Sequence, residues 1–233
     1  MSANQPSIAE TPGGPGKRAQ VLGRWRFAIW GAALLGGVGI GAAIHLAKGT
    51  SSKSQGSSSA AVQTWAAGQR PAPAFSLVDQ NGKTVSLAGF RGRPVLITFI
   101  DPFCRNFCPR EASVLSNAVE QLGAGRPAIV AVSVDPWADT LKNFQQDALH
   151  WNLAPGWQWG TGSRANLAAV WKSYEVGVLV TRKTIAGITV RYITHTGATY
   201  LVDGTGHERA LFLYPFKASD VVGAAKSVLG SSA

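Results

Sequence analysis

Short apolar runs and amphipathic segments alternate along the chain after residue 94. Residues 95–100 and 128–134 are almost entirely apolar, which is typical of strands covered on both faces of a sheet. Between them, residues 109–122 repeat apolar positions at helical spacing, from Leu115 to Leu122. The pattern predicts a strand–helix–strand unit whose two strands are parallel.

Further elements are predicted on both sides of this unit. Two short apolar-polar runs at residues 74–79 and 83–87 flank Asn81-Gly82, which predicts a β-hairpin. Helices are predicted over residues 140–149, 164–174 and 219–229, and strands over residues 157–159, 188–194, 198–203 and 210–214. We expect the strands at 188–194 and 198–203 to pair with each other across a turn. A mixed sheet with helices on both faces is a thioredoxin-like α/β fold.

One long apolar segment lies near the N-terminus. Residues 27–47 contain no Asp, Glu, Lys or Arg, and the segment is long enough to span a hydrocarbon core of about 30 Å as a helix. Several Lys and Arg residues precede it, so the positive-inside rule predicts a cytoplasmic N-terminus. A cleaved signal peptide is the alternative, but His45 occupies a position where a small-x-small cleavage site at the end of the run would need a small residue. We therefore expect a retained single-pass anchor.

The resulting domain organisation has four parts. Residues 1–26 are predicted to be a disordered, basic cytoplasmic tail, and residues 27–47 a transmembrane helix. Residues 48–72 begin with a Ser- and Gly-rich run and are predicted to be a flexible tether, which leaves 73–233 as the folded domain. We expect the protein in the inner (cytoplasmic) membrane, with the folded domain on the periplasmic or extracytoplasmic side.

The charge balance narrows the possible partners. The chain carries 22 Lys and Arg against 12 Asp and Glu, a formal net charge of +10. The basic residues are scattered instead of forming a stripe, so we predict no nucleic-acid partner. The surplus favours an acidic protein partner or an anionic membrane surface.

The only two cysteines, Cys104 and Cys108, are four positions apart and join the strand at 95–100 to the helix at 109–122. Backbone N–H groups and the dipole at a helix N-terminus favour the thiolate, which is both a nucleophile and a soft-metal ligand. A disulfide across so short a loop would staple little of the domain together. The spacing therefore leaves two chemistries open, a redox-active disulfide and a copper site.

A set of short motifs occurs in a fixed order between residues 75 and 229. They are Phe75-Ser76-Leu77-Val78-Asp79, Phe90-Arg91-Gly92-Arg93-Pro94-Val95-Leu96, Cys104-x-x-x-Cys108-Pro109, Val132-Ser133-Val134-Asp135-Pro136, Thr161-Gly162-Ser163, Tyr200-Leu201-Val202-Asp203 and Pro215-Phe216. In this order they resemble the Sco/SenC family of membrane-anchored copper chaperones, which serve assembly of the copper centre of cytochrome oxidase. The predicted anchor and tether fit the same family.

The resemblance implies a specific site and specific partners. It assigns the metal ligands to Cys104, Cys108 and His195, with Cu(I) as the bound ion and Cu(II) tolerated. The implied partners are the copper-binding subunit of a cytochrome oxidase, a copper donor and a thiol reductant. Two positions depart from the family pattern: Arg105 stands where the family often has Pro, and Thr194 where it often has Asp.

Donor chemistry agrees with copper. Two thiolates and one imidazole suit this soft metal, and three ligands satisfy low-coordinate Cu(I). A structural zinc site is normally closed by four ligands, and the chain has no third cysteine. Without the resemblance, His195 would be interpreted as an ordinary turn histidine.

An enzyme is the alternative function. A thiol–disulfide oxidoreductase would use Cys104 and Cys108 as its redox pair and keep the oxidase subunit's cysteines reduced. Such enzymes commonly have C-x-x-C, one residue shorter than the spacing here, and a cis-proline facing the thiols. No proline occurs between Pro155 and Pro215, and His195 stands about where one is expected. A peroxidase is less favoured because T-x-x-C is absent, and enzymatic activity stays open.

Overall fold

The structure is a computed structural model that describes residues 61–230. The predicted tail (1–26), the predicted transmembrane helix (27–47) and residues 48–60 of the predicted tether lie outside the described residues. Within residues 61–230, no helix has the length and apolar character needed to cross a membrane.

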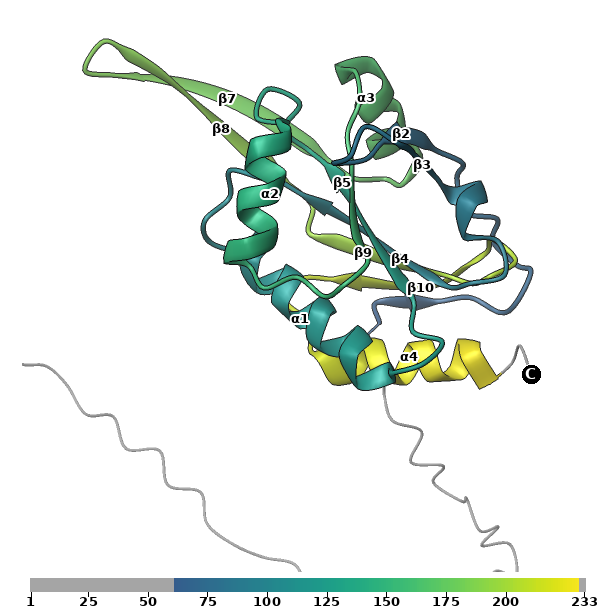
Figure 1. The fold of residues 1–233 in the computed structure, drawn as a ribbon. Coiled ribbons are helices and arrows are strands. Elements are labelled where there is room, and N and C mark those ends of the chain that lie inside the picture. Colours follow the sequence, from purple (N-terminus) through teal and green to yellow (C-terminus); the bar gives the residue numbers. More distant parts are fainter. Residues whose placement is uncertain (1–60, 231–233) are drawn as a thin grey trace, which may run out of the picture. The chain divides into compact units, whose positions relative to one another are not determined.

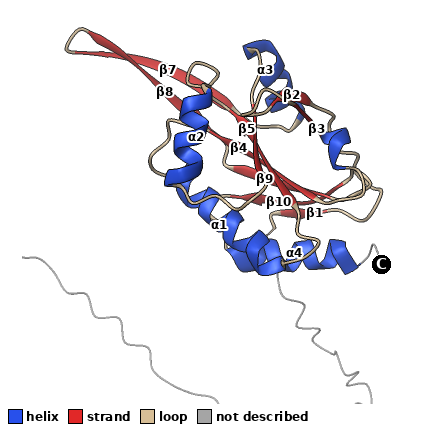
Figure 2. Ribbon diagram, viewed as in Figure 1, coloured by secondary structure: helices blue, strands red, loops and turns tan. Residues whose placement is uncertain are grey.

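A six-stranded mixed sheet forms the centre of the domain (Figure 2). In spatial order its strands are β1 (Gln63–Thr64), β10 (Glu208–Leu213), β9 (Ala198–Val202), β4 (Val95–Ile100), β5 (Ala128–Ser133) and β6 (Trp157–Gly160). Strands β4, β5 and β6 run parallel, and β9 is antiparallel to β4. Every residue of β4 and β5 is buried, which confirms the prediction of two central strands covered on both faces.

Helices cover both faces of this sheet (Figure 1). On one face, Leu96 and Ile100 pack against apolar residues of α1 (Cys108–Leu122), α2 (Leu141–His150) and α4 (Ala218–Gly230). On the other face, Ile97 and Phe99 pack against α3 (Arg164–Ser173), the 3-10 turn η1 (Leu87–Phe90) and the hairpin of β2 (Ser76–Val78) and β3 (Thr84–Ser86). The predicted thioredoxin-like α/β arrangement is therefore confirmed.

The domain begins earlier than the sequence predicts. Strand β1 pairs with β10, and Pro71 forms an isolated bridge with His207. The predicted tether is consequently wrong for residues 61–72, which are part of the folded domain. The cause is that β1 is only two residues long, too short for an alternating pattern to be recognised.

The predicted pairing of residues 188–194 with 198–203 is also wrong. Strand β8 (Ile188–His195) pairs with β7 (Val178–Ile185), a strand not predicted from the sequence, while β9 pairs with β4 and β10. Ala186 and Gly187 form the tight turn between β7 and β8, with φ values of 48° and 80°. Together β7 and β8 form a ribbon that projects beyond the body of the domain (Figure 1).

Candidate metal centre

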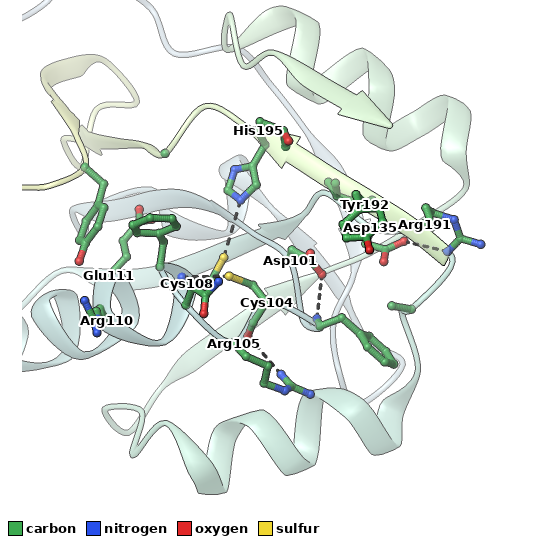
Figure 3. Close-up of a pocket in the computed structure, with 18 of the residues that line it drawn as sticks. Asp101, Cys104, Arg105, Cys108, Arg110, Glu111, Asp135, Arg191, Tyr192 and His195 are labelled. Carbon is green, nitrogen blue, oxygen red and sulfur yellow. Dashed lines mark hydrogen bonds and ion pairs between the residues drawn. The ribbon is translucent and has the colours of Figure 1, made fainter. Parts of the chain in front are cut away.

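Two segments that are distant in the sequence, the β4–α1 connection and the end of β8, bring the predicted ligands together (Figure 3). Cys104 lies in the loop after β4, Cys108 is the first residue of α1, and His195 is the last residue of β8. The Sγ of Cys108 is 3.7 Å from the Nε2 of His195. The backbone N–H of Cys108 donates a hydrogen bond to the Sγ of Cys104 at 3.3 Å. The structure thus places all three predicted residues at one site.

The loop that carries Cys104 is held by local hydrogen bonds. The carboxylate of Asp101 accepts from the backbone N–H of Phe103 at 2.7 Å, and its carbonyl accepts from the N–H of Cys104 at 3.1 Å. The guanidinium of Arg105 donates to the carbonyl of Pro102 and forms an ion pair with Asp147 at 3.4 Å. These contacts fix the position of Cys104 before α1 begins.

The start of α1 stabilises a thiolate on Cys104. Its N-cap residue, Phe107, has no side chain that can accept a hydrogen bond, so backbone donors are left for the sulfur. The pKa of Cys104 is lowered to about 5, first by a hydrogen bond from the Cys108 thiol and then by backbone N–H donors of residues 106–108. Partial burial opposes this shift without cancelling it. Cys104 is therefore ionised at neutral pH and half-buried.

Cys108 is the protonated member of the pair. Its side chain is buried, and its pKa is raised because its thiol donates to Cys104, because of burial, and because of the negative charge on Cys104. The cysteines are not joined by a disulfide. A half-buried thiolate on Cys104 in front of a buried thiol on Cys108 gives the two sulfurs different roles.

His195 is oriented for ligation through one ring nitrogen. Its Nδ1 lies 3.1 Å from the carbonyl oxygen of Thr196, which requires the proton on Nδ1 because a carbonyl only accepts. Burial lowers the pKa of His195, so the ring is neutral at neutral pH. The lone pair of Nε2 then faces Cys108.

These residues line an open cleft of about 1020 Å³. Other residues that line it come from the loop after β5, from β8 and from the segment after β10, among them Asp135, Trp137, Arg191, Tyr192 and Tyr214. Within residues 61–230, no group of three His, Cys, Asp or Glu side chains is close enough together to hold a metal ion in the present conformation. A metal held by Cys104, Cys108 and His195 would draw these side chains closer together.

Sequence reasoning missed a buried carboxyl beneath the thiols. Glu111 is 2 % exposed and accepts hydrogen bonds from the hydroxyls of Thr98 at 2.7 Å and Thr199 at 3.0 Å. Burial raises its pKa to about 7. Its position three residues after Cys108, on the same face of a helix, is the sequence signal that would have found it.

The family can now be assigned. A sequence model described as SCO1/SenC matches residues 64–230, nearly the whole described domain. The chain belongs to the SCO1/SenC family. The resemblance drawn from the motifs is thereby confirmed.

Individual relatives agree with this membership. The chain is 36% identical over 109 residues to the mitochondrial SCO2 homolog of Bos taurus, a match that covers 44% of this chain and 39% of the bovine protein. It therefore spans about two-fifths of that relative's length. The structure of Bradyrhizobium japonicum ScoI with copper bound matches with a TM-score of 0.59 and 26% identity, over 68% of this chain and 99% of that one.

A shorter stretch of the chain is similar to a peroxiredoxin. The chloroplastic peroxiredoxin Q of Populus jackii is 35% identical over 68 residues, which cover 29% of this chain and 32% of the peroxiredoxin.

Proposed function

We propose that this SCO1/SenC protein is a metallochaperone that binds Cu(I) through Cys104, Cys108 and His195. It delivers the ion to the copper centre of a cytochrome oxidase subunit. The observation that carries the proposal is the 3.7 Å approach of His195 Nε2 to Cys108 Sγ, beside a Cys104 whose pKa is about 5. A relative in the same family, ScoI of Bradyrhizobium japonicum, holds copper in its solved structure.

The donor set suits Cu(I) as a cargo. Two sulfurs and one neutral imidazole match the preference of a soft ion, and three ligands complete a low-coordinate site. Cys104 is already ionised, so binding has to remove only the proton of Cys108, which leaves to solvent. Because Cys108 is buried and Cys104 half-buried, Cys104 is the sulfur that an incoming ligand reaches first.

The order in which the copper ligands are released follows from the different burial of Cys104 and Cys108. A thiolate of the receiving subunit replaces Cys104 on the copper, and the buried Cys108 and then His195 follow. Each step exchanges one ligand for another, so the ion is never free. The direction of transfer depends on which protein binds Cu(I) more tightly.

The location of the protein in the cell is inferred from its sequence. Residues 27–47 anchor the chain in the inner membrane, residues 1–26 stay in the cytoplasm, and the described domain lies on the exported side. Residues 48–60 serve as the tether. A tether of this kind raises the effective concentration of the domain near a membrane-bound target.

Thiol–disulfide exchange is a second candidate, favoured by the low pKa of Cys104 in front of the buried Cys108. The Cys104 thiolate attacks a disulfide of the partner and releases one partner thiolate. The Cys108 thiol then loses its proton and attacks the mixed disulfide, which frees the second partner thiol and joins Cys104 to Cys108. A separate dithiol reductant restores the pair.

Anaerobic Cu(I) titration of the reduced full chain against a competing chelator tests the main proposal. We expect stoichiometric tight binding that is lost in Cys104→Ser and weakened in His195→Ala. His207→Ala is the matched control, because His207 lies outside the cleft and contacts the Thr205 hydroxyl. Failure of the wild type to compete for Cu(I), together with rapid exchange with a disulfide substrate, would instead establish the second candidate.

A further inference from the structure

Exposed aromatic side chains surround the mouth of the cleft. Phe103 and Phe107, which bracket Cys104 in the sequence, are 56% and 64% exposed, and Tyr192 of β8 is 43% exposed. Clustered exposed apolar groups are unusual on a soluble surface and mark interaction sites. We call these three residues, together with Trp137, Arg105 and Arg110, the cleft rim; all six line the cleft.

The two cations of the cleft rim are exposed to solvent, Arg110 without a partner in the described domain and Arg105 despite its ion pair with Asp147, whereas the acidic side chains of the cleft are held by neighbouring groups. Asp101 accepts from the backbone N–H of Phe103, Glu111 is buried under two threonine hydroxyls, and Asp135 is paired with Arg191 at 3.6 Å. Arg105 has an exposed side chain, and Arg110 is exposed as well. A molecule approaching the cleft therefore meets aromatic rings and positive charge.

Arg110 has no interaction within the described domain that explains an arginine at this position. No carboxylate or carbonyl among residues 61–230 pairs with its guanidinium. It also lies in the first turn of α1, where the helix dipole disfavours a cation. A residue that opposes a local rule without an internal compensation is expected at a functional surface.

We infer that the cleft rim docks an acidic, apolar-containing segment of a protein partner that exchanges ligands with Cys104. Aromatic residues and arginine are the side chains enriched at the centres of protein interfaces. Carboxylates of the partner pair with Arg110, beside the exposed guanidinium that Arg105 shares with Asp147, while apolar groups pack on Phe103 and Phe107. The inference rests on the proposed function for the identity of the exchanging site, and it adds the chemistry of the partner.

A membrane surface is the other anionic candidate, and the geometry favours a protein. The aromatic rings surround a recess of about 1020 Å³, and the thiolate of Cys104 lines that recess. A protruding protein segment can enter a recess and reach the sulfur. A lipid headgroup layer would cover the rim and close the thiolate off from exchange.

Three synthetic peptides test the inference. They share one apolar sequence with a central serine in place of cysteine and differ in their flanks, which carry Asp and Glu, Asn and Gln, or Lys and Arg. Binding is measured to the reduced, copper-free full chain in phosphatidylcholine nanodiscs. We expect the acidic peptide to bind roughly tenfold more tightly than the neutral one at low salt, and the gap to close at high salt.

Matched variants identify the residues that produce the preference for the acidic peptide. Arg110→Glu is expected to remove the preference for the acidic peptide, whereas Lys172→Glu makes the same change of charge on α3 and is expected to preserve it. Phe107→Ala is expected to weaken all three peptides by a similar factor. Equal binding of the acidic and neutral peptides, or equal effects of Arg110→Glu and Lys172→Glu, would overturn the inference.

A second measurement addresses the membrane alternative. The rate of Cys104 alkylation is compared in nanodiscs with and without phosphatidylglycerol, for the wild type and Arg110→Glu. We expect no protection by the anionic lipid, and protection that depends on Arg110 would assign the cleft rim to the membrane. Because the peptide readout needs no copper, loss of copper binding with intact peptide preference would refute the proposed function and leave this inference standing.

Discussion

Arg191 forms an ion pair with Asp135, with 3.6 Å between Nη1 and Oδ1, and this pair joins the β7–β8 ribbon to the loop after β5. The guanidinium also stacks over Trp137, with its Cζ 4.5 Å from the ring centroid. Arg191 lies opposite Arg182 in the ribbon, an unfavourable pairing of like charges that Asp135 compensates. His195 follows four residues later on the same face of β8, so the pair positions the imidazole.

The first prediction concerns Arg191 as a positioning residue. Arg191→Ala releases the middle of β8 from the loop after β5, and we expect the affinity for Cu(I) to fall by roughly tenfold, the lower limit for residues that orient a metal ligand. Arg191→Lys keeps the cation and should recover part of the loss. In the His195→Ala background, Arg191→Ala should have no further effect on chelator competition. Equal losses in both backgrounds would show that Arg191 acts elsewhere.

How much of the fold is visible in the sequence depends on the length of each pattern. Strands β4 and β5 and helix α1 are long, periodic segments, and their predicted positions agree with the structure to within a residue or two. β1 has two residues, and the turn of the β7–β8 ribbon uses Ala186 at positive φ, where Gly, Asn or Asp is the usual signal. Weak local signals of this kind leave strand pairing to tertiary contacts.

Some residues of the candidate site are likewise predicted by local sequence patterns and others are not. Cys104 and Cys108 are found from spacing alone, because a strand followed by a helix places them at the edge of the sheet. His195 is 87 positions from Cys108, and only the resemblance to a family linked them before the structure did. Asp135 pairs with Arg191 across the cleft, and Glu111 lies beneath the thiols; contacts of this kind depend on how β8 and α1 pack, which no local pattern encodes.

The imidazole should matter more for Cu(II) than for Cu(I). Two thiolates hold Cu(I) well without a third ligand, whereas the harder Cu(II) benefits more from a nitrogen donor. We therefore expect His195→Ala to reduce the Cu(II) affinity by a larger factor than the Cu(I) affinity, and to change the thiolate-to-copper absorption band. Competition titrations with both ions, with His207→Ala as the control, measure the two factors. A larger loss for Cu(I) would contradict the assigned role of His195.

The acidity of Cys104 predicts a pH profile for its reactivity. Since its pKa is about 5, the thiolate fraction rises through that pH and is nearly complete at pH 7. We expect the rate of alkylation by iodoacetamide to rise with a midpoint near pH 5 and then level off. Cys108→Ser replaces the thiol that contributes most to the lowered pKa with a hydroxyl, and Cys108→Ala removes the hydrogen bond altogether.

The two variants separate the causes of that acidity. Cys108→Ala should move the midpoint upward toward the ordinary cysteine value of about 8.5, and Cys108→Ser should move it less. Mass spectrometry identifies the alkylated residue at each pH. A midpoint that stays near pH 5 in Cys108→Ala would assign the shift to the helix N-terminus and the backbone donors alone.

Glu111 makes the stability of the domain depend on pH. Its pKa is about 7 in the folded state against 4.5 as the ordinary value, because burial disfavours the charged form. The folded state therefore holds the proton more strongly, and the free energy of unfolding falls as pH rises from about 4.5 to 7. Glu111→Gln keeps the oxygen that accepts from Thr98 and Thr199 and removes the ionisation, so the variant should be more stable than the wild type at pH 8 by up to about 3 kcal/mol. At pH 4.5 the free energies of unfolding of the two proteins should be nearly equal.

Urea unfolding of the wild type and Glu111→Gln measures the difference, with the exposed Glu120→Gln on the same helix as the control. A wild type that remains the more stable protein at pH 8 would show that the ionised carboxylate is stabilised in place.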